Sequence, residues 1–206
     1  MSKDSYTHTS LPGTPGGPLM FLFHGTGGNE NQLLGLAIDL MPGIAAISPR
    51  GDVSEQGAAR FFRRTGEGVY DMEDLAARTR TMAGFAQAHI DAAKPSSVIG
   101  IGFSNGANIL ASLIFAQPNL FDAAVLMHPL IPFEPQVEGD LSGKRILITA
   151  GRHDTICPPN LTSRLESHLR ALKADVTLEW HEGGHEMRQN ELVAARTFLA
   201  PYRNAK

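Results

Sequence analysis

The feature that most constrains the fold of this chain is the alternation of short apolar runs with helical patterns from residue 18 onward. Uninterrupted apolar runs of this length are typical of strands that are buried on both faces of a sheet. Alternating strands and helices predict an α/β fold, with a mostly parallel sheet of six or seven strands and helices on both faces. The runs are Leu19–His24, Ile44–Ser48, Ser97–Phe103, Ala123–Met127, Arg145–Ala150 and Val176–Trp180.

Helical patterns lie in the gaps between these runs. The clearest cover residues 71–93, 105–115, 161–172 and 186–199. Asp71 is a typical N-cap for the first of them, and Pro95 stops it. The segment Gly51–Tyr70 has no clear pattern, so we expect it to be the longest irregular stretch.

The chain has 206 residues, which at roughly 150 residues per domain indicates one domain. Residues 1–17 are polar and rich in Gly and Pro, and we expect a loose lead-in with a short edge strand near Tyr6–Thr9. Residues 18–206 then form a single domain. No long insertion separates the apolar runs, which predicts that there is no lid domain.

Composition and charge disfavour several classes of protein. Lys and Arg total 18 and Asp and Glu total 21, a formal net charge of −3, which argues against nucleic-acid binding because that needs a basic surface. No apolar stretch approaches the ~18 residues of a membrane helix, so membrane insertion is not expected. There is no apolar signal segment near Met1, and the single cysteine, Cys157, suits a reducing compartment. We therefore expect a cytoplasmic protein.

A motif at the end of the third run points to a nucleophile. Ligands bind at the carboxyl ends of strands in parallel sheets, so functional residues are expected there. Gly102-Phe103-Ser104-Asn105-Gly106 is G-x-S-x-G between a strand and a helix, and its glycines allow a sharp turn that presents the serine hydroxyl. The alternative is a Gly-rich turn with no chemical role. We predict that Ser104 is the nucleophile.

A serine nucleophile needs a base and an acid that orients the base. In this arrangement they follow the nucleophile along the chain in the order acid, histidine. Asp154 comes just after the run Arg145–Ala150, at the carboxyl end of a strand. Asp122 and Asp175 precede apolar runs, at the opposite edge, and Asp140 lies in a polar loop. Asp154 is therefore the predicted acid.

Two histidines follow the last apolar run. His185 lies in a Gly-Gly-His loop that can bring an imidazole over the serine, whereas His181 is expected to end the strand. His128 precedes the acid, so chain order disfavours it. The letters H-E-x-x-H occur at residues 181–185, but a zinc site needs them inside a helix, which the two glycines disfavour. We predict His185 as the base, with no metal and no cofactor.

Acyl transfer also needs backbone N–H donors aimed at the developing negative charge. One comes from the residue after the nucleophile, Asn105, and another from the Gly-rich loop after the first run, His24–Glu30. Thr26 is the expected donor in that loop, with Gly27 as second choice. The loop lacks the Lys-Ser/Thr ending of a P-loop, so nucleotide binding is not expected.

The chain resembles the α/β-hydrolase fold and, within it, the phospholipase/carboxylesterase family, which includes acyl-protein thioesterases. It looks most like small bacterial carboxylesterases linked to hydroquinone and quinone tolerance. The likeness spans residues 19–190 and is carried by His24–Glu30, Arg60–Arg64, Ser104–Ile109 and Asp154–Pro158.

The chain departs from the broader family at the elbow. The broader family usually has Gln and Gly-Gly there, where this chain has Asn105, Gly106 and Ala107. This departure argues against fatty-acyl thioesterase specificity more than against hydrolysis. Dienelactone hydrolases, a neighbouring group of similar size and fold, use Cys as nucleophile. Here the elbow residue is Ser104, and Cys157 is better interpreted as a small apolar residue.

The resemblance and the residues together predict a serine carboxylesterase. It would hydrolyse small soluble esters through Ser104, His185 and Asp154, with an acyl-enzyme intermediate. A thioesterase or lysophospholipase for longer acyl substrates would use the same residues. A binding protein that kept the fold and lost turnover is a further alternative.

The expected substrate pocket combines two segments: Gly51–Tyr70, which contains Arg60–Arg64, and Met127–Phe133. These segments contribute Phe62, Arg63, Met127, Ile131 and Phe133. Residues 60–64 could equally form a surface loop whose phenylalanines pack into the core. The expected partner is a small-molecule ester, and a homodimer is the default assembly on general grounds.

Overall fold

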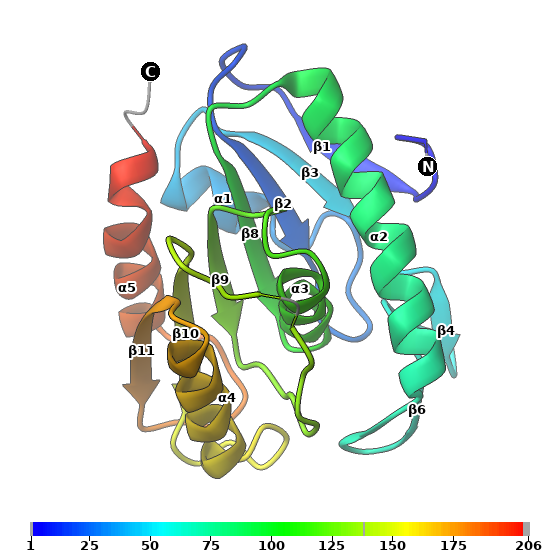
Figure 1. The fold of residues 1–206 in the computed structure, drawn as a ribbon, viewed down its shortest axis with the longest axis vertical. Helices are drawn as coiled ribbons and strands as arrows, with labels where there is room; N and C mark the ends of the chain where they lie inside the picture. Colours follow the sequence, from blue (N-terminus) through cyan, green and yellow to red (C-terminus); the bar gives the residue numbers. More distant parts are fainter. Residues whose placement is uncertain (1, 138, 204–206) are drawn as a thin grey trace.

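The computed structural model describes residues 2–137 and 139–203, and these form a central sheet covered by helices (Figure 1). The strand order is β1-β3-β2-β8-β9-β10-β11. All neighbouring strands pair in parallel except β1, which is antiparallel to β3. The predicted mostly parallel sheet is therefore confirmed, with seven strands. Their bounds are β1 (His8–Leu11), β2 (Leu19–Phe23), β3 (Ala45–Pro49), β8 (Val98–Phe103), β9 (Ala123–Met127), β10 (Arg145–Gly151) and β11 (Asp175–His181).

Helices cover both faces of the sheet, as predicted. The cluster of buried apolar residues on one face includes side chains of α1 (Leu34–Leu40) and α5 (Gln189–Leu199). The cluster on the other face includes side chains of α2 (Met72–Ala93), α3 (Asn105–Ala116) and α4 (Pro159–Ala171). A short 3-10 helix, η1 (Ala200–Tyr202), follows α5.

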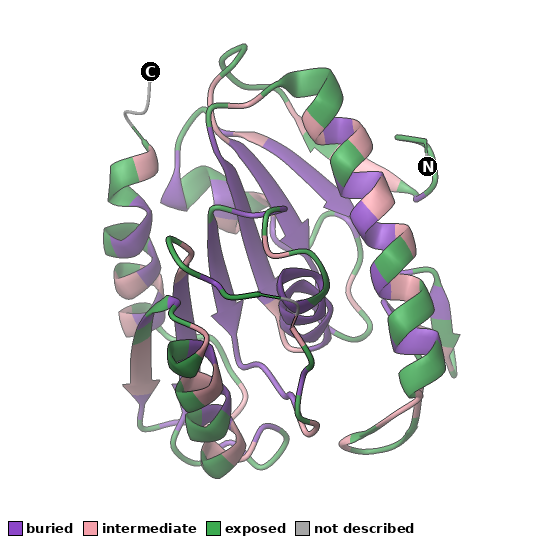
Figure 2. Cartoon of the chain, in the orientation of Figure 1, coloured by how far each residue is buried: buried purple, intermediate pink, exposed green. Residues whose placement is uncertain are grey.

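The central strands supply both apolar layers because successive side chains of a strand point to opposite faces. In β2, Phe21 and Phe23 belong to the layer under α2 and α3, whereas Met20 and Leu22 belong to the layer under α1 and α5. Figure 2 shows the middle strands and α3 as buried, while α2, α4 and α5 expose their outer sides. This burial explains why the strands read as continuous apolar runs.

Several element boundaries differ from the prediction. Gly51–Tyr70 is not irregular: it contains two antiparallel hairpins, β4 (Val53–Glu55) with β5 (Ala58–Arg60), and β6 (Arg64–Gly66) with β7 (Val69–Tyr70). Figure 1 shows them beside the N-terminal end of α2. Their strands have only two or three residues, too few to show an alternating pattern. The hairpins, α1 and η1 are therefore the elements that the sequence analysis missed.

Two further differences between predicted and observed element bounds lie near the chain termini. The predicted edge strand is present but lies two residues later, at His8–Leu11, and it is hydrogen-bonded to β3, so the expected loose lead-in contributes to the central sheet. The last helix begins at Gln189, not Glu186, because residues 183–188 form bends and irregular backbone after the edge strand β11. In the part of the chain that the structure describes, no helix is long and apolar enough to cross a membrane.

Candidate active site

Ser104 occupies a strained turn between β8 and α3. Its φ is 52° and its ψ is −117°, a backbone conformation that L-residues rarely adopt and that marks functional sites. The glycines around it permit close packing: a Cβ on Gly102 would lie 2.5 Å from the Gly106 carbonyl oxygen, and a Cβ on Gly106 would lie 1.9 Å from the Phe23 carbonyl oxygen. The G-x-S-x-G sequence is therefore required by backbone contact between β2, β8 and α3.

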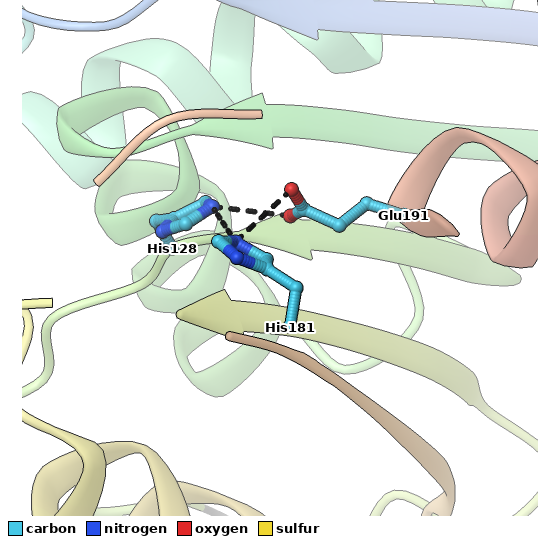
Figure 3. Close-up of side chains that lie close together, drawn as sticks. All are labelled: His128, His181 and Glu191. Atoms are coloured by element: carbon cyan, nitrogen blue, oxygen red, sulfur yellow. Dashed lines mark hydrogen bonds and ion pairs between the residues drawn. The ribbon is translucent and has the colours of Figure 1, made fainter. Parts of the chain in front are cut away.

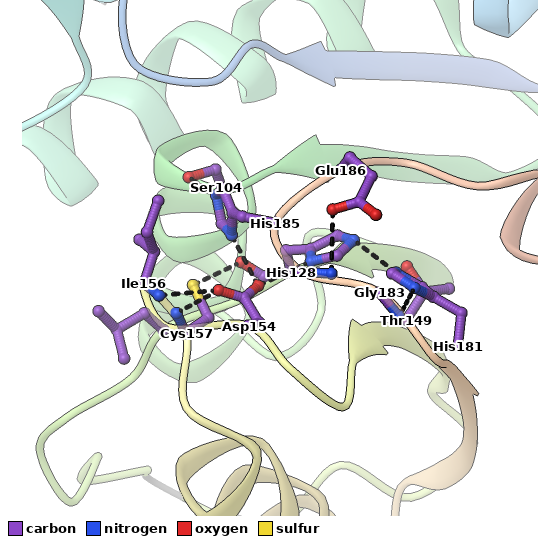
Figure 4. Close-up of polar contacts among 12 residues, drawn as sticks. Ser104, His128, Thr149, Asp154, Ile156, Cys157, His181, Gly183, His185 and Glu186 are labelled. Atoms are coloured by element: carbon purple, nitrogen blue, oxygen red, sulfur yellow. Dashed lines mark hydrogen bonds and ion pairs between the residues drawn. The ribbon is translucent and has the colours of Figure 1, made fainter.

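The structure brings the three residues of the predicted triad together at the carboxyl edge of the sheet (Figure 4). Ser104 Oγ lies 2.9 Å from His185 Nε2, and His185 Nδ1 lies 2.7 Å from Asp154 Oδ2. Ser104 follows β8, Asp154 follows β10 and His185 follows β11. Because these strands run in parallel, three loops distant in sequence meet at one point.

Asp154 is buried but ionised. Burial raises the pKa of its carboxyl group, but the Cys157 N–H and the imidazoles of His128 and His185 outweigh burial and hold that pKa below its usual value. Its Oδ1 accepts hydrogen bonds from the N–H groups of Ile156 and Cys157, at 2.9 and 2.8 Å. The carboxylate is therefore fixed in orientation and charged at neutral pH.

Cys157 lies beside the triad without being part of it. Its side chain is buried, and its Sγ lies 3.2 Å from the His128 carbonyl oxygen. Burial raises the pKa of the thiol far above its usual value. A thiol that stays protonated is a poor nucleophile, so the geometry agrees with the interpretation of Cys157 as a small buried residue.

The side chains of His24 and Gln32 fix the conformation of the loop that follows β2. His24 Nε2 accepts a hydrogen bond from the Gly51 N–H at 2.9 Å, and His24 Nδ1 donates to the Gly25 carbonyl at 2.7 Å. Burial lowers the pKa of His24, which keeps this ring neutral. Gln32 Oε1 accepts from the Gly25 N–H at 2.8 Å. These bonds fix the start of the loop.

The two expected oxyanion donors, the N–H groups of Thr26 and Asn105, differ from the second choice, the N–H of Gly27, in the hydrogen bonds that they already make. Within the described residues, the N–H groups of Thr26 and Asn105 donate to no protein acceptor, and both residues line the cavity that contains Ser104. Asn105 is the first residue of α3, where an N–H has no partner inside the helix. The Gly27 N–H instead donates to the Ala59 carbonyl at 2.9 Å. Gly27 is therefore wrong as a donor, because hairpin β4–β5 uses its N–H.

A cavity of about 310 Å³ opens beside Ser104 and His185. Thr26, Asn105, Phe103 and Cys157 form part of its wall. The remaining wall consists of Arg60, Arg64, Glu67, Gly68, Tyr70, Asn108, Leu130 and Ile156. Apart from Asn108 and Ile156, this second group lies in the two segments that the sequence analysis expected at the pocket, residues 51–70 and 127–133.

The pocket predictions from residues 60–64 were wrong about the individual side chains. Phe62 is fully buried and packs edge-on against Tyr70, with ring centroids 4.8 Å apart. The Arg63 side chain is 60% exposed and pairs with Asp71 at 3.2 Å. The wall is instead formed by Arg60 and Arg64. The hairpins decide which side chains face the cavity, and the sequence pattern did not reveal those hairpins.

The pocket predictions from residues 127–133 are also wrong about the individual side chains. Met127 is fully buried as the last residue of β9. Ile131 and Phe133 line a separate hollow of about 360 Å³ beside α4, together with Arg164 and His168. Leu130 is the residue of this segment that lines the cavity at Ser104.

A hydrogen-bonded group that the sequence analysis missed holds one wall of the cavity. Tyr70 Oη donates to the Leu130 carbonyl at 2.6 Å and accepts from Asn108 Nδ2 at 2.9 Å, while Asn108 Oδ1 accepts from the Leu130 N–H at 2.6 Å. Burial raises the pKa of the Tyr70 hydroxyl, so it stays protonated. Asn108 lies four residues after Ser104, one helical turn away, which is the one signal that could have found it.

Behind the triad lies a buried cluster of His128, His181 and Glu191 (Figure 3). His128 Nε2 is 3.1 Å from Glu191 Oε1, His181 Nε2 is 3.3 Å from Glu191 Oε2, and the two Nε2 atoms are 3.4 Å apart. His128 Nδ1 is 2.9 Å from Asp154 Oδ2. His181 ends β11, as predicted. Chain order disfavoured His128, yet it contacts the predicted acid.

The donor atoms of this cluster are spaced like ligands of one metal ion, but their protonation does not fit a metal. The Gly183 N–H donates to His181 Nδ1 at 3.0 Å, so the proton of this neutral ring is on Nε2, the atom that a metal would need. The H-E-x-x-H letters also form no helix. The stretch from Glu182 to Arg188 consists of bends and irregular backbone, and the Glu182 side chain is 74% exposed.

Comparison with known proteins agrees with the fold. "Putative hydrolase MhqD" of Bacillus subtilis (strain 168) is 38% identical over 180 residues, which cover 86% of this chain and 90% of that protein. A Bacillus cereus carboxylesterase structure is 37% identical, with a TM-score of 0.91, and the match covers 96% of this chain and 95% of that one. Agrobacterium tumefaciens Atu2452, of unknown function, is 56% identical, with a TM-score of 0.93 and coverage of 98% and 99%.

These relatives confirm the α/β-hydrolase fold and the resemblance to bacterial carboxylesterases. The dienelactone hydrolase family matches residues 51–191. The chain belongs to the dienelactone hydrolase family and is a hydrolase. In contrast to the cysteine nucleophile expected of that group, its elbow carries Ser104.

Proposed function

We propose that the protein is a serine carboxylesterase that hydrolyses small carboxylic esters through Ser104, His185 and Asp154. The observation that carries this proposal is the continuous hydrogen-bond chain from Ser104 Oγ through His185 to Asp154, with Ser104 and His185 facing a cavity. The family match and the carboxylesterase among the relatives support it.

Acylation starts at the hydroxyl of Ser104. His185 Nε2 accepts the hydroxyl proton while Oγ attacks the ester carbonyl carbon. The carbonyl oxygen becomes an oxyanion, which the N–H groups of Thr26 and Asn105 stabilise. Asp154 accepts the hydrogen bond from His185 Nδ1, which fixes the tautomer and stabilises the charged ring. His185 then protonates the leaving alkoxide, and the acyl group stays on Ser104.

Deacylation repeats these steps with water as the nucleophile. His185 removes a proton from water, the resulting hydroxide attacks the acyl carbonyl, and the same N–H groups stabilise the second oxyanion. When this intermediate collapses, Ser104 Oγ leaves and regains its proton from His185. The position of Asn105 at the N-terminus of α3 adds the positive end of the helix dipole to this site.

The size of the cavity supports small substrates. Its volume of about 310 Å³ is at the lower end of the roughly 300–1,000 Å³ of small-molecule sites. Its wall mixes apolar residues such as Leu130 and Ile156 with polar ones such as Tyr70 and Arg64. A short acyl or aryl group fits this space better than an extended fatty chain.

The test is hydrolysis of p-nitrophenyl esters of increasing acyl length by the wild-type protein and by Ser104→Ala. We expect turnover of acetate and butyrate, with kcat at least ~10⁴-fold lower in the variant because removal of a triad nucleophile costs up to about 10⁶. Ser163→Ala, which changes an exposed serine of α4, is the matched control. A variant that keeps its activity would refute the proposal.

Matched oxygen ester and thioester substrates separate the esterase from the thioesterase. We expect the short oxygen ester to be preferred, and a preference for long acyl thioesters would contradict the proposed substrate class. Labelling of Ser104 with a fluorophosphonate addresses the binding-protein alternative. A protein that neither reacts with this probe nor hydrolyses any ester would be a binding protein.

A further inference from the structure

We propose that His128 is a positioning residue that lies between Asp154 and Glu191 as an imidazolium, and that its charge and its Nδ1–H hold Asp154 ionised and directed at His185. This inference rests on the proposed function. It deepens that proposal, because it adds a buried cation to a site that the sequence describes as three residues.

The contacts of His128 are short and fully buried. Its Nδ1 lies 2.9 Å from Asp154 Oδ2, and its Nε2 lies 3.1 Å from Glu191 Oε1. The side chains of all three residues have no exposed surface. Figure 4 shows that Asp154 lies between the rings of His128 and His185. One carboxylate oxygen therefore serves two imidazoles.

Charge balance restricts the protonation states that this cluster can adopt. Two buried carboxylates, Asp154 and Glu191, are adjacent, and the ion pairs that they form within the described residues involve only histidines. An unpaired buried charge is too costly to persist. Either a carboxyl group takes a proton or a nearby imidazole carries a positive charge.

The hydrogen bonds of Glu191 favour its ionised form. Its Oε1 accepts from Thr149 Oγ1 at 2.5 Å, and its Oε2 accepts from the Arg188 N–H at 2.6 Å. It lies in the first turn of α5, where the helix dipole favours a negative charge. Burial raises the pKa of Glu191, but its contacts with His128 and Thr149 outweigh burial and lower it. The cation must therefore be an imidazole.

The Gly183 N–H decides which imidazole is charged. It donates to His181 Nδ1 at 3.0 Å, so that nitrogen has no proton and His181 is neutral. His128 has an oxygen of a different carboxylate near each ring nitrogen, so a proton on both nitrogens is favourable. Burial lowers the pKa of His128, but Glu191 and Asp154 outweigh it and raise that pKa.

The backbone at His128 gives independent support. Its φ is 52°, in the left-handed region that favours glycine. This conformation is held by a hydrogen bond from the His128 N–H to the Thr149 carbonyl at 2.8 Å and by the contact of Cys157 Sγ with its carbonyl. Strain of this kind persists where the side chain has a function that requires its position.

The charge of His128 matters when His185 becomes protonated. The resting cluster holds two carboxylates and one imidazolium, a net charge of −1, and it becomes neutral when His185 takes the Ser104 proton. The titratable groups that face His128 are Asp154 and Cys157 after β10, His181 of β11, His185 and Glu191. Without the imidazolium, His185 would sit in a more negative environment and bind its proton more tightly.

The first test is the pH dependence of kcat/KM for His128→Asn. Asn tolerates a left-handed backbone and keeps a donor near Asp154. We expect kcat to fall by about 10–100-fold and the acidic limb of the profile to move up by about one pH unit, as the loss of a nearby charge implies. His153→Gln, which changes an exposed histidine next to Asp154 in sequence, is the control. An unshifted acidic limb would overturn the inference.

The second test does not depend on activity. In ¹⁵N-histidine NMR of the wild-type protein at pH 7, we expect His128 to carry a proton on both ring nitrogens. Its titration midpoint should move to lower pH in Glu191→Gln, because a neighbouring negative charge is removed. A singly protonated His128 in the wild type would overturn the inference even if His128→Asn fails to fold. Retained activity of Ser104→Ala would instead refute the proposed function and leave this result unaffected.

Discussion

The guanidinium of Arg60 donates a hydrogen bond from Nη1 to Thr26 Oγ1 at 2.8 Å. Arg60 ends β5, and only 4% of its surface is exposed. Burial lowers its pKa, but a guanidinium stays charged at any ordinary pH. This contact ties hairpin β4–β5 to the loop that supplies one proposed oxyanion donor.

Arg60→Met is therefore expected to reduce catalysis through the backbone of Thr26. We expect kcat to fall by about tenfold with little change in KM. A misplaced oxyanion donor reduces the stabilisation of the transition state, whereas it leaves substrate binding nearly unchanged. Stability should fall by about 1–3 kcal/mol, since Glu55 and the Thr26 hydroxyl lose a buried partner. Arg63→Met, at an exposed arginine, is the control. A wild-type kcat in Arg60→Met would show that the contact does not position the loop.

Gly106→Ala is expected to destabilise the protein severely. The added Cβ would lie 1.9 Å from the Phe23 carbonyl oxygen and 2.5 Å from that of His24, so α3 would have to move away from β2. We expect a loss of about 3 kcal/mol or more in the free energy of unfolding by urea. Gly35→Ala, at an exposed position of α1 with no neighbour within 4 Å, should stabilise by about 0.5–1 kcal/mol. Equal stabilities would mean that β2 and α3 are less closely packed than described.

Tyr70→Phe tests the wall of the cavity. The change removes the hydroxyl that bonds to the Leu130 carbonyl and to Asn108. We expect KM for short esters to rise by about three- to tenfold with kcat nearly unchanged, and stability to fall by about 1–2 kcal/mol because buried partners are left unpaired. Tyr202→Phe, at a tyrosine that does not line this cavity, is the control. A change confined to kcat would indicate that Tyr70 acts on the reaction itself.

The stability of the protein should depend on pH through its buried carboxylates. Asp154 and Glu191 have a lowered pKa in the folded state: burial raises each pKa, but their hydrogen bonds outweigh it. Such groups contribute stability above their unfolded pKa of about 4, and the contribution is lost as pH falls through the folded pKa. We expect the free energy of unfolding to decrease from about pH 5 downward.

Glu191→Gln should make this pH dependence shallower, because one of the two groups is no longer titratable. Glu182→Gln, at a carboxylate whose side chain is 74% exposed, should leave the slope as in the wild type. Urea unfolding at several pH values measures both. An unchanged slope in Glu191→Gln would mean that Glu191 is protonated in the folded protein.

The order of strands and helices could be predicted because burial imposes local patterns. A strand covered on both faces must be apolar throughout, which is visible in Ala123–Met127, and a helix start needs a cap, which is visible in Asp71. Asp71 accepts the Asp74 N–H at 3.0 Å, and α2 ends at Ala93, as predicted. Hairpins β4–β5 and β6–β7 lack such a pattern because their strands are very short.

The members of the proposed triad could be proposed from chain order and from their places after strands. The residues that support the triad could not be predicted from chain order or from their places along the chain. Chain order placed His128 before the acid and therefore disfavoured it, but strand pairing puts β9 directly beside β10, so its first loop residue contacts Asp154. Glu191 joins the same cluster from α5, and no local pattern in the sequence links these positions.

The sequence by itself determined the layered α/β architecture, the Gly-rich turn at Ser104 and the order of the nucleophile, acid and histidine positions. These features depend on local chemistry: apolar continuity, helix caps and glycine where backbones approach closely. Only the tertiary structure decided that Arg60 and Tyr70 line the cavity in place of Phe62 and Arg63, that the Gly27 N–H is already used, and that His128 lies between two carboxylates. Such choices depend on which side chains distant segments bring together, and no spacing along the chain records that.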